Sequence, residues 1–389
     1  MERYFAPCPR GLEPALADEL RGLGAGEIAA TDGGVAFAGS LDLAYRANLE
    51  SRLASRILWR VGDSAYRNEG DVYEAARALD WPRWFRSERT LRVDVAATRS
   101  PLKSLEFATL RIKDAVCDRH RAVSGVRPSV SKERPDVRVH AYLTSDRATF
   151  YLDTSGEPLF KRGYRRERAE APLRENLAAG LLKLAQWIPG SALLDPLCGS
   201  GTIAIEAALI ALDIAPGLKR TFGFQKLGWY DGPTWQRIKQ AAQRRMKPIA
   251  FAGIYASDID AAAIARCRVN LAAAGVSAAV AVERADVLHR EAPASSGAIV
   301  TNPPYGVRLS EDDRATRALP FALAEFYPKL GDALKRRYAG WTVYLLSGDP
   351  RLPKLIGLRA SRRTPLYNGA LECRLYEYRM VAGSARATR

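Results

Sequence analysis

The sequence predicts two structural regions, an α+β region followed by an α/β region with a doubly wound, mostly parallel sheet. Before residue 154 or so, several segments show the apolar–polar alternation of a half-buried strand. From about Pro172, strand-like and helix-like segments follow one another in turn, which is typical of parallel sheets with crossover helices. Near the C-terminus, Asn368-Gly369 lies between two alternating segments and predicts a closing antiparallel hairpin.

The first region is expected to contain a helix at 13–23, because Leu16, Leu20 and Leu23 recur at helical spacing. A short strand is expected at 34–38. The rest of the region is expected to form a strand at 91–96, a long helix at 106–123, and paired strands at 137–143 and 148–153.

The second region is expected to begin with a strand ending at Asp195 and a helix at 201–212. A second helix is expected after Asp260, a plausible N-cap, and before Gly275, which suits a helix C-terminus. The remaining strands are expected at 250–257, 279–283, 298–301, 341–347, 359–367 and 371–381. The tail, 384–389, is expected to be disordered.

Composition excludes several classes of protein. No apolar run approaches the roughly 18–20 residues that cross a bilayer, and the N-terminus lacks the pattern of a secretory signal. The five cysteines are widely separated and the three histidines are not at metal-ligand spacing, so we expect free thiols, a cytoplasmic location and no metal. The net charge of +16 favours a polyanionic partner, although charged segments are often only a solvated surface.

Acidic residues and glycines stand where a nucleoside cofactor binds in such sheets, beyond the carboxyl ends of the strands. Asp195 ends the first strand of the second region, and Gly199 and Gly201 let the backbone pass close to a ligand. Asp258 is placed to accept hydrogen bonds from ribose hydroxyls, and Asp286 from an adenine amine. A nicotinamide dinucleotide is disfavoured, because its acidic residue follows the glycines by about 20 residues and Asp258 lies much farther on.

The segment Thr301-Asn302-Pro303-Pro304-Tyr305 follows a predicted strand and is suited to holding a planar exocyclic amine. The side-chain oxygen of Asn302 can accept one amine N–H and the carbonyl of Pro303 the other, while the two prolines restrict the backbone. Tyr305 can stack on the base that carries the amine. The pattern predicts methyl transfer to an amine and leaves guanine, adenine, cytosine and a protein glutamine open. A nucleic-acid base must then be single-stranded or flipped out of its stack.

The connector between the regions is strongly basic. Five cations stand against one anion between Lys161 and Arg168, with Tyr164 among them. Such a segment can track an RNA backbone, or it can be a linker kept soluble by charge. The sequence leaves both interpretations open.

Nearly the whole chain resembles the THUMP-domain class I RNA methyltransferases. Residues 1 to about 155 resemble a ferredoxin-like segment followed by a THUMP domain, and the stretch from Ser100 through Lys103 to Val116 is similar to that family's helix. The connector at 159–165 and the following 171–178 resemble the link into a methyltransferase domain with a Rossmann-like, seven-stranded sheet.

The resemblance implies S-adenosylmethionine as cofactor and an RNA partner. It implies five expected segments: a ferredoxin-like segment at 1–64, a THUMP domain at 65–155, a basic linker at 156–170, a methyltransferase domain at 171–383 and the tail. Cofactor-binding residues would be Asp195, Gly199, Gly201, Thr202, Asp258, Asp286 and Asn302. Catalytic residues would be Asn302, Pro303, Pro304 and Tyr305, and RNA-binding residues would be Lys103, Lys161, Arg162, Tyr164, Arg165 and Arg166.

The substrate that the resemblance implies is the N2 amine of a guanine in 23S ribosomal RNA, free or in an assembling large subunit. Some relatives carry a second methyltransferase domain for 7-methylguanosine, and we expect that second activity to be absent here. A transfer RNA guanine-N2 methyltransferase shares the architecture and the loop, and stays open. A protein glutamine methyltransferase is disfavoured by the basic charge and the RNA-type module. An inactive assembly factor is disfavoured by the intact acids and loop.

Overall fold

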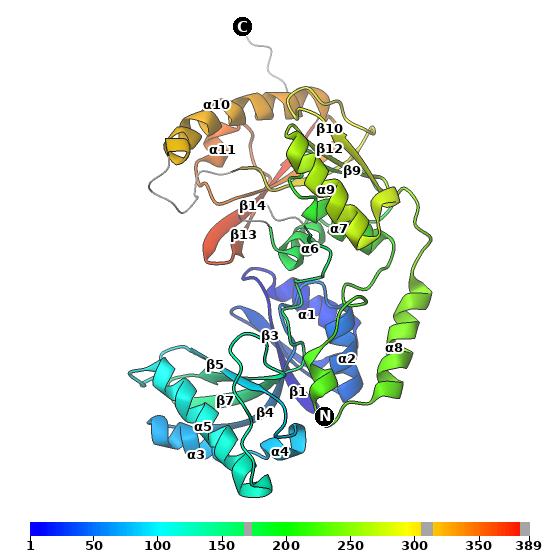
Figure 1. Ribbon diagram of the computed structural model, residues 1–389. Coiled ribbons are helices and arrows are strands. Elements are labelled where there is room, and N and C mark those ends of the chain that lie inside the picture. Colours follow the sequence, from blue (N-terminus) through cyan, green and yellow to red (C-terminus); the bar gives the residue numbers. More distant parts are fainter. Residues whose placement is uncertain (167–172, 305–313, 382–389) are drawn as a thin grey trace. The chain divides into compact units, whose positions relative to one another are not determined.

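The computed structural model describes residues 1–166, 173–304 and 314–381, and the side chains of 314–322 are left aside (Figure 1). The described chain divides into two compact units. The first comprises Met1–Cys8, Leu16–Leu159 and Gly217–Ala242, and the second comprises Pro9–Ala15, Phe160–Pro216 and Gln243–Arg389. The expected disordered tail lies outside the described residues. No helix within the described ranges is both long and apolar enough to cross a membrane.

The first unit is built on a single seven-stranded sheet with the order β2-β3-β1-β4-β7-β6-β5. β4 pairs with β1 on one side and with β7 on the other, so one sheet continues through both of the expected N-terminal segments. The strands at 34–38, 91–96, 137–143 and 148–153 are confirmed to within one residue. The bounds are β1 (Glu2–Pro7), β2 (Gly26–Thr31), β3 (Gly34–Gly39), β4 (Leu58–Ala65), β5 (Leu91–Ala97), β6 (Val137–Leu143) and β7 (Arg147–Asp153).

The longest helix of this unit, α5 (Leu105–Ser124), begins and ends where local sequence signals place it. The side chain of Ser104 accepts a hydrogen bond from the Phe107 N–H at the start of α5, and Gly125 ends that helix in the left-handed region. The long helix expected at 106–123 is therefore confirmed. The bounds are α1 (Glu13–Gly22), α2 (Leu41–Glu50), α3 (Glu69–Ala78), α4 (Trp81–Trp84) and α5 (Leu105–Ser124).

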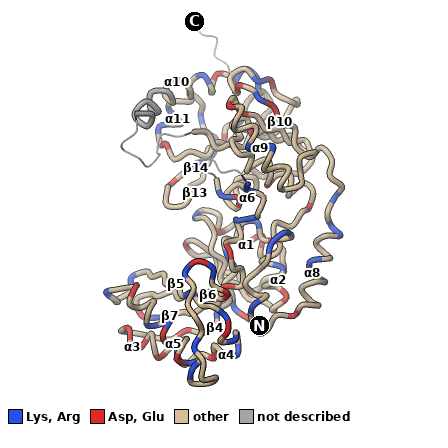
Figure 2. Tube along the Cα trace, viewed as in Figure 1, with Lys and Arg blue, Asp and Glu red and all other residues tan. Residues whose placement is uncertain are grey.

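An inserted segment, Gly217–Ala242, lies in the first unit although its neighbours in sequence lie in the second. It contains η1 (Gly223–Lys226) and most of α8 (Gly232–Arg245). Aromatic packing explains its place: the ring of Tyr45 lies 4.6 Å from that of Phe224 and 5.4 Å from that of Trp229. The expected methyltransferase range, 171–383, includes this segment and stays a prediction. Figure 2 shows Lys and Arg along α8, whose sequence contains no Asp or Glu.

The second unit confirms the expected seven-stranded, mostly parallel sheet, with the order β10-β9-β8-β11-β12-β14-β13. β10, β9, β8, β11 and β12 pair in parallel, while β14 pairs antiparallel with β12 and β13. Asn368 pairs with Leu371, so the hairpin turn is Gly369-Ala370, one residue beyond the expected position. The bounds are β8 (Leu193–Asp195), β9 (Ile254–Asp258), β10 (Val280–Arg284), β11 (Gly297–Thr301), β12 (Trp341–Ser347), β13 (Arg362–Asn368) and β14 (Leu371–Arg379).

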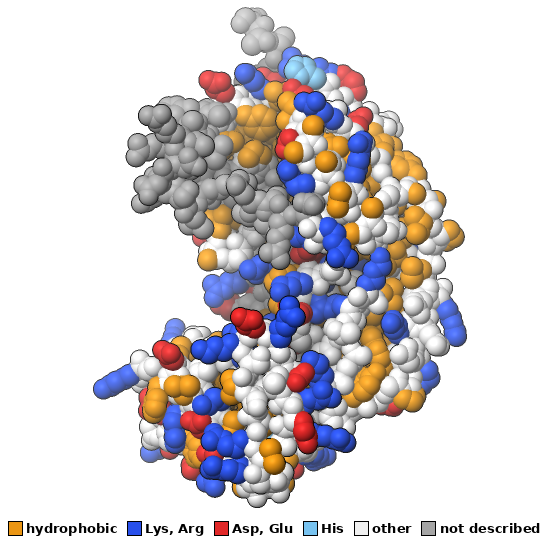
Figure 3. All heavy atoms as spheres, viewed as in Figure 1, with side chains coloured by type: hydrophobic (Ala, Val, Ile, Leu, Met, Phe, Trp, Pro, Cys, Tyr) orange, Lys and Arg blue, Asp and Glu red, His pale blue; other side chains and the backbone are white. Residues whose placement is uncertain are grey.

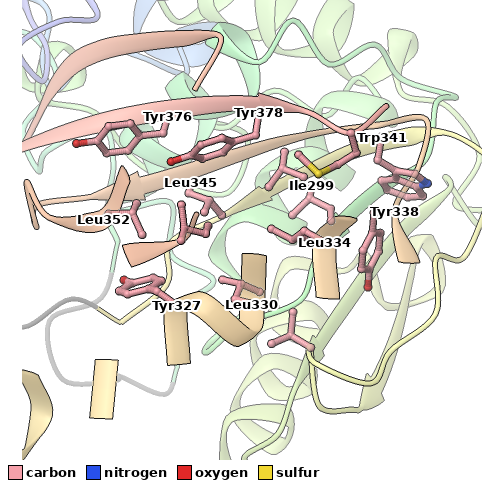
Figure 4. Close-up of a cluster of buried hydrophobic side chains, with 14 of the residues drawn as sticks. Ile299, Tyr327, Leu330, Leu334, Tyr338, Trp341, Leu345, Leu352, Tyr376 and Tyr378 are labelled. Carbon is pink, nitrogen blue, oxygen red and sulfur yellow. The ribbon is translucent and has the colours of Figure 1, made fainter. Parts of the chain in front are cut away.

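The main hydrophobic cluster of this unit lies between the sheet and α10. In Figure 4, Tyr327, Leu330 and Leu334 from α10 face Tyr376 and Tyr378 from β14, and all five side chains are buried. The strand order reverses between β8 and β11, which is where ligands bind in doubly wound sheets. The helices are α6 (Glu175–Leu184), α7 (Thr202–Ala211), α9 (Ala261–Ala274), α10 (Arg314–Arg337) and α11 (Leu352–Leu355), with the short η2 (Ser277–Ala279).

Candidate active site

Asp195 is a buried carboxyl at the carboxyl end of β8, an interior strand of the second unit's sheet. Its Oδ1 accepts a hydrogen bond of 2.7 Å from the Thr301 hydroxyl at the end of β11. Burial raises the pKa of Asp195 to about 7, although the Thr301 and Leu197 donors oppose that shift. The side chain therefore links the two strands on either side of the point where the strand order reverses.

We expect Asp195→Asn to become more stable, relative to the unchanged protein, as the pH rises from 5 to 8. The raised pKa means that the folded state retains a proton that the unfolded state loses, so the Asp195 contribution to stability falls with rising pH and levels off above about 7. Asn does not titrate, and its oxygen can still accept from Thr301. Urea unfolding should show a gain of about 3 kcal/mol for the variant between the two pH values, because about two pH units separate pH 5 from the folded pKa. A constant difference between the two proteins would contradict the assignment.

In the glycine-rich turn after β8, a ligand can approach the backbone closely. Gly199 and Gly201 both have positive φ, +53° and +81°. A Cβ at Gly201 would lie 2.5 Å from the Cys267 sulfur, whereas a Cβ at Gly199 would have no atom within 4 Å. Gly201 is therefore required by packing and backbone conformation together. The space beside Gly199 leaves room for a ligand.

Asp258 and Asp286 stand at the ends of the next two strands. Asp258 Oδ2 accepts a hydrogen bond of 3.0 Å from the Gly199 N–H, and its Oδ1 accepts one of 3.0 Å from the Asp260 N–H. Asp286 Oδ1 accepts from the Leu288 N–H at 2.9 Å, and its Oδ2 lies 2.9 Å from His289 Nδ1. Asp258 thus holds the glycine-rich turn directly, while Asp286 is held within its own loop.

Asn302, directly after β11, carries a buried side-chain oxygen with no hydrogen-bond partner among the described residues. Such an orphan acceptor costs about 1–3 kcal/mol, and native proteins retain few of them. Pro303 is buried beside it, and the Pro304 carbonyl accepts a hydrogen bond of 2.7 Å from the Tyr327 hydroxyl. Tyr305 lies outside the described residues.

Tyr327 is a residue of this site that the sequence did not reveal. It belongs to α10, far along the chain from the loop, and its side chain is fully buried. Its tyrosine ring fits the apolar face of an amphipathic helix, so nothing local indicates the contact with Pro304. Only the tertiary structure brings the hydroxyl to the loop.

The connector differs from the RNA strap expected from its charge. Arg162 and Tyr164 are buried at 4% and 5% exposure, and the Tyr164 hydroxyl lies 3.1 Å from Glu206 Oε1. Arg165 is also largely buried, because its guanidinium pairs with Glu175 at 3.0 Å. These three side chains make contacts within the second unit, and their contact with RNA stays a prediction. Lys103, Lys161 and Arg166 are exposed.

Acidic residues at successive strand ends, an open glycine-rich turn and a buried amide acceptor after β11 together define a class I methyltransferase domain. The chain belongs to the family of RMKL-like methyltransferase domains, whose model matches residues 162–377. The model of the RlmL ferredoxin-like domain matches residues 3–58, and that of the THUMP domain matches residues 66–153. These matches confirm the family resemblance and the order of the domains.

Curated relatives carry the name ribosomal RNA large subunit methyltransferase K/L. The chain is 43% identical to the one from Syntrophotalea carbinolica over 97% of its own length and 53% of that protein. It is 41% identical to the one from Methylococcus capsulatus over 96% of its own length and 50% of that protein. The chain therefore spans about half the length of these curated relatives.

Solved structures share the whole fold. A protein assigned as a methyltransferase and crystallised with SAH is 28% identical, with a TM-score of 0.86, and the match covers 100% of this chain and 99% of that one. A protein from Clostridium difficile 630, described as a possible methylase, is 29% identical with a TM-score of 0.87 over 100% and 99%. TrmN from Thermus thermophilus is 24% identical with a TM-score of 0.69 over 98% and 100%, a likeness in fold alone.

Proposed function

We propose that this chain transfers a methyl group from S-adenosylmethionine to the N2 amine of a guanine in 23S ribosomal RNA. The observation that carries the chemistry is the buried, unpartnered Oδ1 of Asn302 at the end of β11. The choice of RNA is supported by the relatives named as large-subunit ribosomal RNA methyltransferases and by the THUMP match at 66–153. The cytoplasm is the compartment that suits this substrate.

The residues at the strand ends fit the proposed donor. The carboxylate of Asp258 keeps unused lone pairs beside the glycine-rich turn, which suits it to accept from ribose hydroxyls. Asp286 is placed after β10 to accept from the adenine amine, and the open space at Gly199 admits the ligand. When bound, S-adenosylmethionine supplies an electrophilic methyl group. A structural relative at 28% identity was crystallised with SAH, the product form of this donor.

The loop acts on the acceptor by geometry. A guanine amine is a poor nucleophile because its lone pair is delocalised into the ring. Asn302 Oδ1 and the Pro303 carbonyl would accept its two N–H bonds and leave the lone pair directed at the methyl group. The proton is lost easily once the methylated nitrogen is cationic, so a strong general base is not required. Tyr327 restrains the loop through the Pro304 carbonyl.

RNA docking is proposed for the first unit. Lys103 is exposed immediately before α5, and Phe107 and Leu110 on the first turns of α5 are also exposed, at 49% and 47%. A cation beside exposed apolar side chains suits phosphate contact and base stacking. On the face shown in Figure 3, Lys and Arg side chains are spread among acidic ones. The distribution of charge on this face therefore does not mark a single path for the RNA.

The test is to locate the product. Ribosomal RNA and transfer RNA from cells lacking the gene should be digested and compared with those of the parent strain by mass spectrometry. N2-methylguanosine should be lost from one position in 23S ribosomal RNA. Loss from transfer RNA alone would replace the proposed substrate by the transfer RNA alternative. Methylation of a glutamine-containing peptide by the purified protein without RNA would overturn the RNA assignment.

A further inference from the structure

Arg165 makes four polar contacts in the second unit, and two of them are to the glycine-rich turn of the candidate active site. Its guanidinium donates to the Ser200 hydroxyl at 3.4 Å and to the Thr202 hydroxyl at 3.2 Å. It also donates to the Leu173 carbonyl at 2.9 Å and pairs with Glu175 at 3.0 Å. A planar, five-donor guanidinium is the side chain that can satisfy four acceptors in different directions.

The backbone beside Arg165 reaches the same turn from a second direction. The Arg166 N–H donates to Asn270 Oδ1 at 3.0 Å, and Asn270 Nδ2 donates to the Ser200 carbonyl at 3.1 Å. Asn270 is only 1% exposed, so this relay is shielded from water. Ser200 is thus held through its hydroxyl by Arg165 and through its carbonyl by Asn270.

We propose that Arg165 is a positioning residue that fixes the glycine-rich turn, Gly199–Thr202, in the conformation that binds the methyl donor. This inference rests on the proposed donor site. The turn itself begins α7 at Gly201 without a side-chain cap, and two of its residues have positive φ. Residues outside the turn must therefore fix its backbone conformation, because the glycines of the turn restrict it little.

The buried charges around the connector agree with a positioning role and not with RNA contact. Arg162 and Glu206 are 4% and 0% exposed and lie 3.5 Å apart, and Tyr164 donates to the same Glu206 carboxylate. Burial raises the pKa of Glu175, and the adjacent Arg165 opposes that rise. Glu206 belongs to α7, the helix that follows the turn. The connector therefore fastens both the turn and its helix.

Donor binding to the full chain tests the proposal without knowledge of the RNA. Isothermal calorimetry with S-adenosylhomocysteine should show Kd about tenfold weaker for Arg165→Ala, because two charge-assisted bonds to the turn are lost. Arg165→Lys keeps a cation for Glu175 but lacks the fork that reaches both hydroxyls, so it should fold and still bind several-fold more weakly. The KM for S-adenosylmethionine should rise in both variants, while kcat at saturating donor changes less than about twofold.

A double-mutant cycle separates positioning from general loss of structure. In a Thr202→Val background, the effect of Arg165→Lys on Kd should shrink, because one of its targets is already gone. Arg362→Ala is the matched control: this arginine bonds the Leu184 carbonyl and Glu377 in the same unit, and its loss should leave Kd unchanged.

Equal Kd values for the unchanged protein and Arg165→Lys would overturn the positioning role and leave the proposed function intact. Full additivity of Arg165→Lys and Thr202→Val would also overturn it. Failure of the unchanged protein to bind S-adenosylhomocysteine would instead contradict the proposed donor.

Discussion

Asn302→Ala is expected to lower the rate of methylation about 10²–10³-fold, the cost typical of removing one preorganised hydrogen-bonding group from an active site. Donor affinity should stay within about twofold, because the acids and the glycine-rich turn remain in place. The physical reason is that Oδ1 of Asn302 has no partner among the described residues and is free to accept the amine N–H. Single-turnover methylation of RNA at saturating donor, together with calorimetry, measures both quantities.

Stability provides the control for this variant. An amide that holds the fold together destabilises the protein when it is removed, whereas an unsatisfied acceptor does not. Asn302→Ala should therefore unfold at the same urea concentration as the unchanged protein, or at a slightly higher one. A clear fall in stability, or a collapse of donor binding, would mean that Asn302 serves the fold and that the loop assignment is incorrect.

Tyr327→Phe tests the same loop from its far side. The variant keeps the buried ring and removes only the hydroxyl that donates to the Pro304 carbonyl. We expect about a tenfold loss of rate with unchanged donor affinity, because the acceptors are still present but less well held. Tyr378→Phe is the matched control, since Tyr378 is a buried tyrosine of the same cluster whose hydroxyl has no partner among the described residues.

The features that could be predicted are those whose cause is local. The Asp260 side chain accepts from the Ala262 and Ala263 N–H groups and begins α9, and Gly275 ends it in the left-handed region. Strands β8, β11 and β12 were recognisable because a buried parallel strand reads as a short apolar run. The order of Asp195, Asp258 and Asn302 along the chain was enough to place them at neighbouring strand ends.

The features that could not be predicted depend on tertiary partners. Phe224 and Trp235 lie within the range expected for the methyltransferase domain, and only their packing with Tyr45 assigns them to the first unit. The sequence indicated that the cations of the connector are exposed to solvent, because charged side chains are rarely buried without a partner. Arg165 pairs with Glu175 and Arg162 pairs with Glu206. Both glutamates lie on later helices, and nothing in the local sequence indicates that they pair with the connector.

Asp258→Ala is expected to weaken binding of S-adenosylmethionine about 30–100-fold, because one change removes both the proposed ribose acceptor and the bond to the Gly199 N–H. A hydrogen bond to a charged group contributes about 1.5–3 kcal/mol, and one such bond corresponds to about 10–150-fold in Kd, which contains the expected loss. The loss should appear in Kd and in KM, with kcat at saturating donor reduced far less than in Asn302→Ala. This contrast separates the donor site from the amine site.

Asp260→Ala is the control that makes this test specific. Asp260 lies two residues away, is exposed, and caps α9 by accepting from the Ala262 and Ala263 N–H groups. Its loss should lower stability, as for other N-caps, and leave Kd nearly unchanged. If the two variants weakened donor binding equally, the effect would come from disturbing the β9–α9 turn, and Asp258 would have no direct part in holding the donor. A deficit confined to Asp258→Ala ties donor affinity to the carboxylate that also secures the glycine-rich turn.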